Sequence, residues 1–260
     1  SEQEYEASLI AILLHDIGHG PFSHALEFTL LHKTPHESLS LVFLNSLNLK
    51  FNHQLDLAIK IFTGRYERKF FYQLVSSQLD IDRLDYLQRD CFFTGVSEGT
   101  IGADRIIKMM NIRDDSLVVE EKGIYSVEKF LVARRLMYWQ VYLHKTGVAA
   151  EQLLIRVLQR AKELINEGKP VDCSPAFSYF LHNRVEEENF DEVVLKTFVR
   201  LDDYDIISAM KTWLDHPDFV LQNLCKMLLN RQLLKVKLKK KPVPSEKLKK
   251  LEVEKEALFL

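Results

Sequence analysis

Residues 13–24 read Leu13-Leu14-His15-Asp16-Ile17-Gly18-His19-Gly20-Pro21-Phe22-Ser23-His24, and this stretch decides the fold. The apolar run just before His15 predicts the end of a buried helix, and the glycines and the proline predict that the helix stops there. An imidazole nitrogen and a carboxylate oxygen at a rigid helix end suit a divalent metal ion. A lone His-Asp pair is more often a surface pair, but the apolar helix and the trailing histidines favour a site.

Length and composition indicate an intracellular globular protein. The chain has 260 residues, 47% of them hydrophobic, which is enough for a sizeable core in one large domain or one domain with an appendage. The formal net charge of −2 predicts no general attraction to nucleic acid or to membranes. The three cysteines form no CxxC motif, which favours a reduced cytoplasm, and no run approaches the roughly 20 apolar residues of a membrane span.

Apolar residues recur at helical spacing along nearly the whole chain, which predicts a mainly α protein. The longest helix is expected from Ser126 to Asn166, and the only hairpin at 116–125, with a strand at 117–119 and a turn at 121–123. Thr34 is expected to cap a helix that starts at Pro35. Other helices are expected at 25–32, 35–47, 54–62, 67–76, 78–90, 174–183, 190–200, 205–215 and 217–230.

Charge divides the C-terminal part of the chain. Ten acidic and four basic residues lie between 184 and 219, whereas nine basic and one acidic residue lie between 231 and 250. We interpret the first as a solvated face and the second as a solvated edge or a subunit contact, with an edge strand at 235–239 and a final helix capped by Ser245. The predicted organisation is a core at 1–170, an acidic helical extension at 171–230 and a basic tail at 231–260.

Two further groups of residues indicate chemistry. Asp82, Tyr86 and Asp90 follow one another at i, i+4 and i+8 and share a helix face, and a metal ion would be a partner for Asp82 among its apolar neighbours. The bland alternative is an ordinary surface pair such as Asp85 with Arg89. A His36-Glu37 dyad at a helix start suits a general acid, since the carboxylate would raise the pKa of the imidazole.

The long helix carries a second polar stripe. Arg134, Tyr138, Tyr142 and Lys145 are spaced at i, i+4, i+8 and i+11 on one expected face. Cations and phenols in a row suit a polyanionic ligand with a flat ring, although an amphipathic helix shows such a stripe by chance in many α proteins.

The sequence resembles the HD-domain metal-dependent phosphohydrolases in three segments: the His-rich stretch, His36-Glu37 and residues 82–90. The order, spacing and helical context of these segments agree with the family. They are most similar to the branch of the deoxynucleoside triphosphate triphosphohydrolases. The resemblance is strong over 7–90, continues through the long helix and fades in the C-terminal part. It implies an HD-domain helical core, one divalent metal ion and metal-assisted hydrolysis.

The resemblance also implies roles for individual residues. His15, Asp16 and Asp82 would be metal ligands. The residues implied in catalysis are His19, His36, Glu37 as the group that orients His36, and Glu27. The residues implied in substrate contacts are His24, Arg83, Tyr86, Asp90, Arg134, Tyr138, Tyr142 and Lys145.

The sequence departs from the family pattern at three places. Glu27 stands where the family has an aspartate, and Tyr138 stands where the triphosphohydrolases often have histidine. The family's first metal histidine lies on an earlier helix, whereas none of the fourteen residues before His15 is histidine. The resemblance therefore implies a site completed by a preceding segment, and an inactive chain if no such residue exists.

Three functions follow as alternatives. The first is hydrolysis of dNTPs to deoxynucleoside and triphosphate. The second is an HD phosphohydrolase or phosphodiesterase for other nucleotides or phosphoesters, and the third is a non-catalytic nucleotide-binding HD module. The donor types allow Mn, Fe, Ni, Co, Zn or Mg. The resemblance further implies a homo-oligomer, a dimer or a tetramer. The cysteine pattern predicts a location in the cytoplasm, and the charge and hydropathy predict no membrane partner and no nucleic-acid partner.

Overall fold

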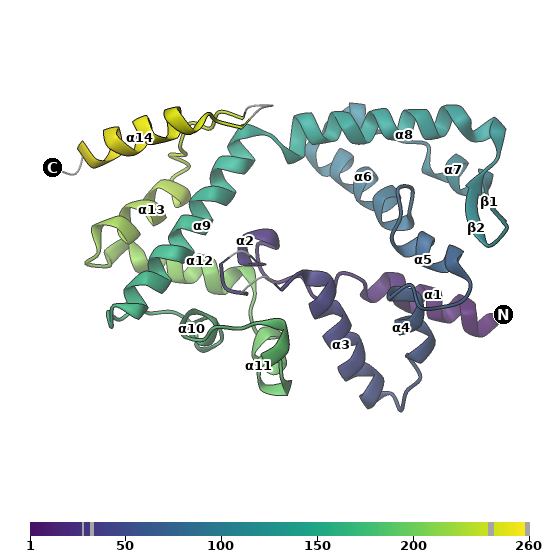
Figure 1. The fold of residues 1–260 in the computed structure, drawn as a ribbon, viewed down its shortest axis with the longest axis horizontal. Helices are drawn as coiled ribbons and strands as arrows, with labels where there is room; N and C mark the ends of the chain where they lie inside the picture. Colours follow the sequence, from purple (N-terminus) through teal and green to yellow (C-terminus); the bar gives the residue numbers. More distant parts are fainter. Residues whose placement is uncertain (28, 32–33, 239–241, 258–260) are drawn as a thin grey trace.

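Helices make up most of the structure, which is a computed structural model that describes residues 1–27, 29–31, 34–238 and 242–257 (Figure 1). The predicted mainly α class is confirmed. The α-helices of the described residues are α1 Glu2–Leu14, α2 His24–Glu27, α3 His36–Lys50, α4 Asp56–Phe62, α5 Lys69–Val75, α6 Ile81–Thr94, α7 Ala103–Met109, α8 Ile124–Met137, α9 Lys145–Asn166, α10 Pro175–His182, α11 Glu192–Phe198, α12 Asp203–Thr212, α13 Phe219–Leu229 and α14 Ser245–Ala257. None of these helices has the length and apolar character needed to span a membrane.

Three apolar clusters hold the helices together, and each of them anchors one element of the candidate site. The largest cluster packs α9 to α13 against α2 and α3. The second joins α6, α7 and α8, and the third joins α1, α4 and α5. The helices α1, α3 and α6 therefore come from different clusters and meet near the middle of the molecule.

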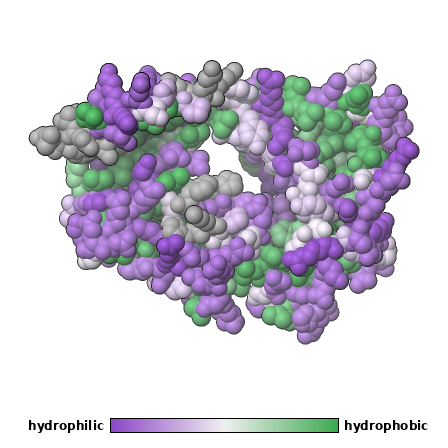
Figure 2. Space-filling view, viewed as in Figure 1, coloured by the Kyte–Doolittle hydropathy of each residue, from purple (hydrophilic) through white to green (hydrophobic). Residues whose placement is uncertain are grey.

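An opening is visible beside that meeting point. Figure 2 shows it near the centre of the molecule, and the same view of the ribbon places it between α2 and α6, below the junction of α8 and α9. The segment that joins α1 to α2 runs along its lower border.

Helix α1 is less buried than its sequence predicted. Ala7 and Ala11 face the core, because small side chains allow the close approach of α4, whereas Leu9 is 48% exposed and Leu13 is 78% exposed. The expectation of a buried helix end is therefore wrong for one face of α1. The helix begins with a capping box between Ser1 and Glu4, and Glu4 also accepts hydrogen bonds from Tyr66 and Arg68.

The expected long helix from 126 to 166 is interrupted. Helix α8 ends at Met137, a π-helical turn covers 138–142, and α9 begins at Lys145. His144 starts the new helix, since its Nδ1 accepts a hydrogen bond from the Thr146 amide at 3.3 Å. The π turn and the break interrupt the regular 3.6-residue spacing on which the expected common face of Arg134 and Lys145 depended.

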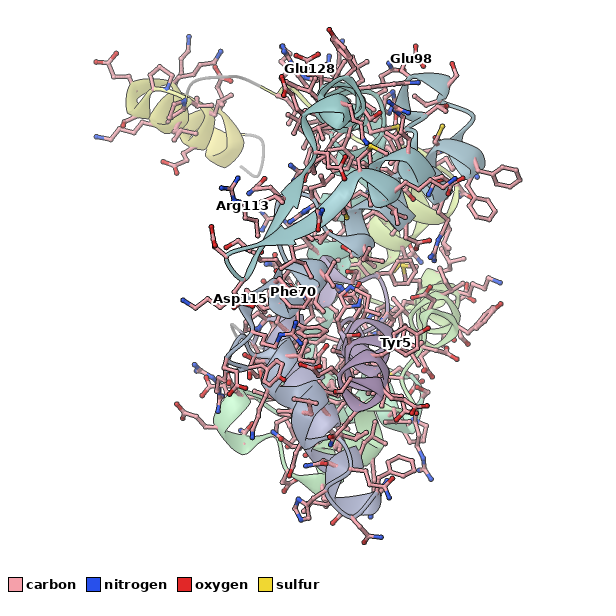
Figure 3. The ribbon with its side chains drawn as sticks, turned by 90° about the vertical axis from the view of Figure 1, so that its right-hand side faces the viewer. Tyr5, Phe70, Glu98, Arg113, Asp115 and Glu128 are labelled. Atoms are coloured by element: carbon pink, nitrogen blue, oxygen red, sulfur yellow. The ribbon has the colours of Figure 1, made fainter. Side chains whose placement is uncertain are left out.

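The hairpin forms with a different partner strand. The expected strand is present as β2 (Ser116–Val119), but it pairs with β1 (Met110–Arg113), and 121–123 is a 3₁₀ turn. Asp114 and Asp115, both with positive φ, form the connecting turn that the sequence reading missed. The tip of the hairpin lies beside α5, where Asp115 accepts a hydrogen bond from the Lys69 amide at 2.6 Å (Figure 3).

Smaller differences concern helix ends and the tail. Helix α3 starts at His36 after Pro35, so the predicted cap at Thr34 is wrong by one position. Residues 235–238 form no strand, residue 239 lies outside the described residues, and the expected final helix is present as α14. The division at 170 and 230 stays a prediction.

Candidate functional site

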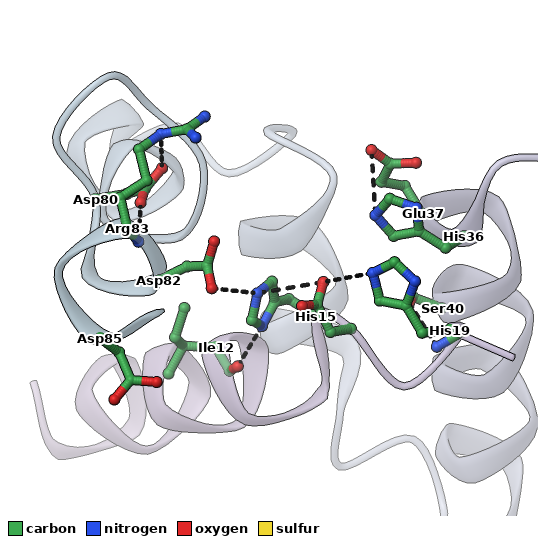
Figure 4. Close-up of polar contacts among 12 residues, drawn as sticks. Ile12, His15, His19, His36, Glu37, Ser40, Asp80, Asp82, Arg83 and Asp85 are labelled. Atoms are coloured by element: carbon green, nitrogen blue, oxygen red, sulfur yellow. Dashed lines mark hydrogen bonds and ion pairs between the residues drawn. The ribbon is translucent and has the colours of Figure 1, made fainter. Parts of the chain in front are cut away.

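His15 and Asp82 bring α1 and α6 together at the candidate metal site. His15 closes the C-terminal end of α1, and its Nδ1 donates a hydrogen bond to the Ile12 carbonyl oxygen at 2.7 Å. The other ring nitrogen, Nε2, lies 3.3 Å from an Asp16 oxygen and 3.5 Å from an Asp82 oxygen (Figure 4). Because Nδ1 carries the donated proton, Nε2 of the neutral ring presents its lone pair to the two carboxylates.

The environment of His15 Nε2 fits a cation. The atom is buried and makes no hydrogen bond with any described residue. With the protein groups alone, the Asp82 carboxylate is the main reason that the pKa of His15 rises to about 8, and His15 in turn lowers the pKa of Asp82. One neutral nitrogen and two anionic oxygens within 4.8 Å of one another form a donor set that suits a divalent metal ion.

His36 and Glu27 form the second part of the site. The His36 Nδ1 and a Glu27 oxygen are hydrogen-bonded at 2.9 Å, whereas the Glu37 carboxylate lies 3.5 Å from Nε2 and is 65% exposed. The nearer carboxylate of His36 is therefore Glu27 and not Glu37. The His19 ring stacks on the His36 ring with centroids 3.8 Å apart, and His19 Nε2 lies 3.8 Å from Asp16.

The turn between α1 and α2 is held from both sides. Gly18 donates its backbone N–H to the buried Ser40 hydroxyl at 2.9 Å, which ties the turn to the first turns of α3. Phe22 and Ser23 have φ values of 52° and 46°, and the Phe22 amide donates to Asp203 at 2.9 Å. These left-handed residues turn the chain so that Glu27 reaches His36. The side chain of His24 lies outside the described part of the structure.

The residues expected to contact the substrate form a cluster between α6 and α8. The Tyr142 hydroxyl donates a hydrogen bond to Asp90 at 2.6 Å. The pKa of Tyr142 is raised above its ordinary value, mainly by burial and secondly by this hydrogen bond. The rings of Tyr86 and Tyr138 each meet the ring of Tyr142 edge to face. Arg134 lies over the Tyr138 ring, and its Nε is buried without a hydrogen bond to any residue that the structure describes. These five residues lie together in space, Lys145 begins α9 after the interruption, and the substrate contacts of all six residues stay a prediction.

Arg83 follows Asp82 on α6 and points elsewhere. Its Nε donates to the Ser77 carbonyl oxygen at 2.7 Å and lies 3.3 Å from Asp80. Asp80 is buried and caps α6 by accepting the Arg83 amide at 2.7 Å. The sequence reading missed this cap, although an aspartate just before an amphipathic segment is a recognisable helix start.

A cavity of about 500 Å³ opens onto the candidate metal donors. Its wall includes His15, Asp16, Asp82 and His36, together with residues that the sequence did not indicate, such as Tyr72. Tyr72 carried no recognisable signal, because it comes from α5 and is near the donors only in the folded chain.

Comparison with known proteins places this fold and site in a family. Residues 101–171 match the family described as HD associated region. A phosphohydrolase of known structure from Bacteroides thetaiotaomicron is 52% identical, with a TM-score of 0.92 over 98% of this chain and 64% of that chain. The uncharacterized protein YwfO of Bacillus subtilis is 37% identical over 89% of this chain and 53% of its own length.

A third relative carries a more specific name. A deoxynucleoside triphosphate triphosphohydrolase SAMHD1 homolog of Dictyostelium discoideum is 28% identical over 64% of this chain and 35% of that protein. The chain spans about half the length of YwfO. The helical fold, the His-Asp donor set and these similarities define the class: the chain belongs to the HD-domain superfamily.

Proposed function

We propose that the protein is a divalent-metal-dependent phosphohydrolase of nucleotides that converts dNTPs to deoxynucleoside and triphosphate. The observation that carries the proposal is the buried Nε2 of His15 between two carboxylates, beside the His36–Glu27 pair. The phosphohydrolase and triphosphohydrolase names of the relatives support the reaction class and the substrate class.

His15, Asp16 and Asp82 would hold the metal ion. When bound there, the ion would supply Lewis acidity toward a phosphoryl oxygen and lower the pKa of a bound water. Mn, Fe, Ni, Co, Zn and Mg are all compatible with one imidazole and two carboxylates.

His36 is proposed as the general acid. Glu27 accepts a hydrogen bond from the Nδ1–H of His36 and stabilises the imidazolium, so that Nε2 can deliver its proton to the leaving oxygen of the deoxynucleoside. His19, stacked on His36 and near Asp16, is proposed to contact the reacting phosphate. The hydrogen bond from the Gly18 amide to the Ser40 hydroxyl holds the turn after α1 against α3, and so fixes His19 relative to His36.

The nucleoside is proposed to occupy the opening beside α6 and α8. Tyr86 and Tyr142 offer flat apolar surfaces for the sugar or base, and Asp90 is placed to accept from a sugar hydroxyl. Arg134, whose Nε is buried without a hydrogen bond among the described residues, is the proposed phosphate ligand on this side.

Product analysis tests the proposal. The protein encoded by the complete gene is incubated with Mn²⁺ and each dNTP, and products are separated by anion-exchange chromatography. We expect deoxynucleoside and triphosphate, with loss of activity in His15→Ala and at least a hundredfold loss in Glu27→Gln. Monophosphate with pyrophosphate or orthophosphate would contradict the proposed reaction.

Two other results would favour the alternatives. His15-dependent release of phosphate or monophosphate from other nucleotides, with inert dNTPs, would favour a broader HD phosphohydrolase. Metal and nucleotide binding without any turnover would favour a non-catalytic module.

The remaining proposals concern assembly and location. We propose a dimer or tetramer of this 30.4 kDa chain, supported by the exposed apolar residues Tyr125, Val132 and Trp139 at seven-residue spacing along α8 and the turn after it. Light scattering during size exclusion would show two or four times the chain mass, and a monomer would contradict it. We also propose a location in the cytoplasm, supported by the three cysteines that form no CxxC motif.

A further inference from the structure

A cavity of about 430 Å³ lies between α2, α9, α12 and α13, in the left half of the molecule in Figure 1. Its wall includes Leu154, Ile207, Met210 and Leu228, and apart from two charged residues every described residue that lines it is apolar. No described residue lines both this cavity and the one at the candidate metal donors. Volumes of about 300–1,000 Å³ with an apolar lining and few polar groups are typical of small-molecule sites.

The two charged residues on the wall are Glu151, on α9, and Arg231, just after α13. Both are exposed, and neither side chain makes an ion pair or a hydrogen bond with any residue that the structure describes, including the other. Their charged groups are therefore available to a ligand whose apolar part fills the cavity.

The backbone at Arg231 has a conformation that glycine would adopt more easily. Helix α13 ends in a Schellman motif, in which the Arg231 amide donates to the Leu228 carbonyl oxygen at 3.2 Å and the Gln232 amide donates to the Met227 carbonyl oxygen at 2.8 Å. Arg231 has a φ of 55° and stands where glycine is usual in this motif. An arginine at such a position costs stability, which supports a function for its side chain at the cavity.

We propose that this cavity binds a free α-amino acid with a large apolar side chain. The carboxylate of the amino acid binds the Arg231 guanidinium, its ammonium binds the Glu151 carboxylate, and its side chain packs against Leu154 and Met210. An apolar carboxylic acid would leave Glu151 beside an anion, and an apolar amine would leave Arg231 beside a cation. A zwitterion provides a partner for both charges.

The site lies next to the turn that leads to the proposed catalytic residues. Phe22 belongs to that turn and lines the cavity, and its amide donates to Asp203 on α12 at 2.9 Å. The following turn of α12 carries Ile207, which lines the same cavity. A ligand in the cavity therefore contacts both sides of this connection. The inference does not depend on the proposed reaction.

Isothermal titration calorimetry at two temperatures tests the site directly. The protein encoded by the complete gene is titrated with phenylalanine, leucine, methionine and tryptophan. Three further probes each lack one part of such a ligand: phenylpropionate lacks the ammonium, phenylethylamine lacks the carboxylate, and glycine lacks the apolar side chain. We expect at least one of the four amino acids to bind, and each of the three probes to bind at least about tenfold more weakly than the tightest amino acid.

Variants test the assignment of the two charged residues. Arg231→Gln and Glu151→Gln should each weaken binding of that amino acid about tenfold or more, since each removes a charge-assisted hydrogen bond. Arg200→Gln is the matched control, because Arg200 is exposed and lines neither cavity. Arg231→Gly should weaken binding as much as Arg231→Gln without lowering the urea midpoint of unfolding, because glycine relieves the left-handed strain. This variant separates loss of the ligand from loss of folding.

Three results would overturn the inference. They are the absence of binding by all four amino acids, binding of phenylpropionate or phenylethylamine as tight as that of the amino acid, and equal weakening by Arg231→Gln and Arg200→Gln. An apolar surface of a second copy is the other candidate occupant. In that case Ile207→Trp should lower the mass measured by light scattering and no amino acid should bind, which also overturns the inference.

Discussion

Gly18→Ala would place a Cβ atom 2.2 Å from the His36 carbonyl oxygen and 2.4 Å from the Ser40 amide nitrogen. Both atoms belong to the backbone of α3, so no side-chain rotation relieves the contact. The turn must move away from α3 by about 1 Å or more to reach van der Waals distance. That movement breaks the 2.9 Å hydrogen bond from the Gly18 amide to the Ser40 hydroxyl.

The expected cost has two parts. Overpacking a close contact costs about 1–3 kcal/mol, and leaving a buried amide unpaired costs about 1–3 kcal/mol. We therefore expect Gly18→Ala to lower the free energy of unfolding by about 4 kcal/mol. Ser40→Ala removes only the hydrogen bond and should cost about 1–3 kcal/mol. Both changes also loosen His15 and Asp16 relative to His36. Mn²⁺-dependent activity should therefore fall by more than the fraction of unfolded protein accounts for.

Urea unfolding, followed by circular dichroism, measures the stability of each variant. Gly147→Ala is the control, because Gly147 lies in α9 with open space around its Cβ position and should be neutral or stabilising by about 0.5–1 kcal/mol. The reasoning would be refuted if Gly18→Ala unfolded within about 0.5 kcal/mol of the wild-type protein and bound Mn²⁺ equally well.

Three further predictions concern other parts of the chain. Asp82→Asn should weaken Mn²⁺ binding at least tenfold by calorimetry, whereas Asp85→Asn, which affects an exposed pair with Arg89, should not; equal effects would contradict the assigned donor set. Arg160 lowers the pKa of Asp218 to about 2. This pair should therefore add about 2 kcal/mol to the free energy of unfolding above pH 4, and this contribution should disappear as the pH falls toward 2. Urea unfolding between pH 2 and 7 should show this loss in the wild-type protein and not in Asp218→Asn, with exposed Asp215→Asn as control. Burial raises the pKa of Cys225 to about 12 and that of Cys173 to about 11. Iodoacetamide at pH 8 should therefore label neither thiol in the native protein, which peptide mass spectrometry would show. Rapid labelling of Cys225 would contradict its burial.

The metal donors illustrate what could be predicted from the sequence. His15 and Asp16 follow an apolar run and precede helix-breaking residues, and Asp82 stands among apolar neighbours on a helix face, so their type and spacing indicated a metal site. Their proximity in the fold agrees with that expectation, and their role as ligands stays a prediction. The cluster of Tyr86, Asp90, Arg134 and Tyr142 was also within reach, because helical periodicity places each pair on one face.

The partner of His36 could not be predicted in the same way. Glu37 is adjacent in sequence, yet Glu27 makes the hydrogen bond, because two left-handed residues and the short α2 bring the chain back toward α3. The position of Lys145 relative to Arg134 could not be predicted for a related reason, since the π turn changes the rotation per residue along the helix. Neither backbone feature has a pattern in the side-chain sequence.

The sequence by itself determined the helical class, most helix positions and the identity of the donor groups, because helix formation depends on propensities and contacts within about four residues. Only the tertiary structure decided which donors meet. Helices α1, α3 and α6 belong to three apolar clusters, and their relative placement depends on contacts between residues far apart in the chain. The same packing left one face of α1 exposed.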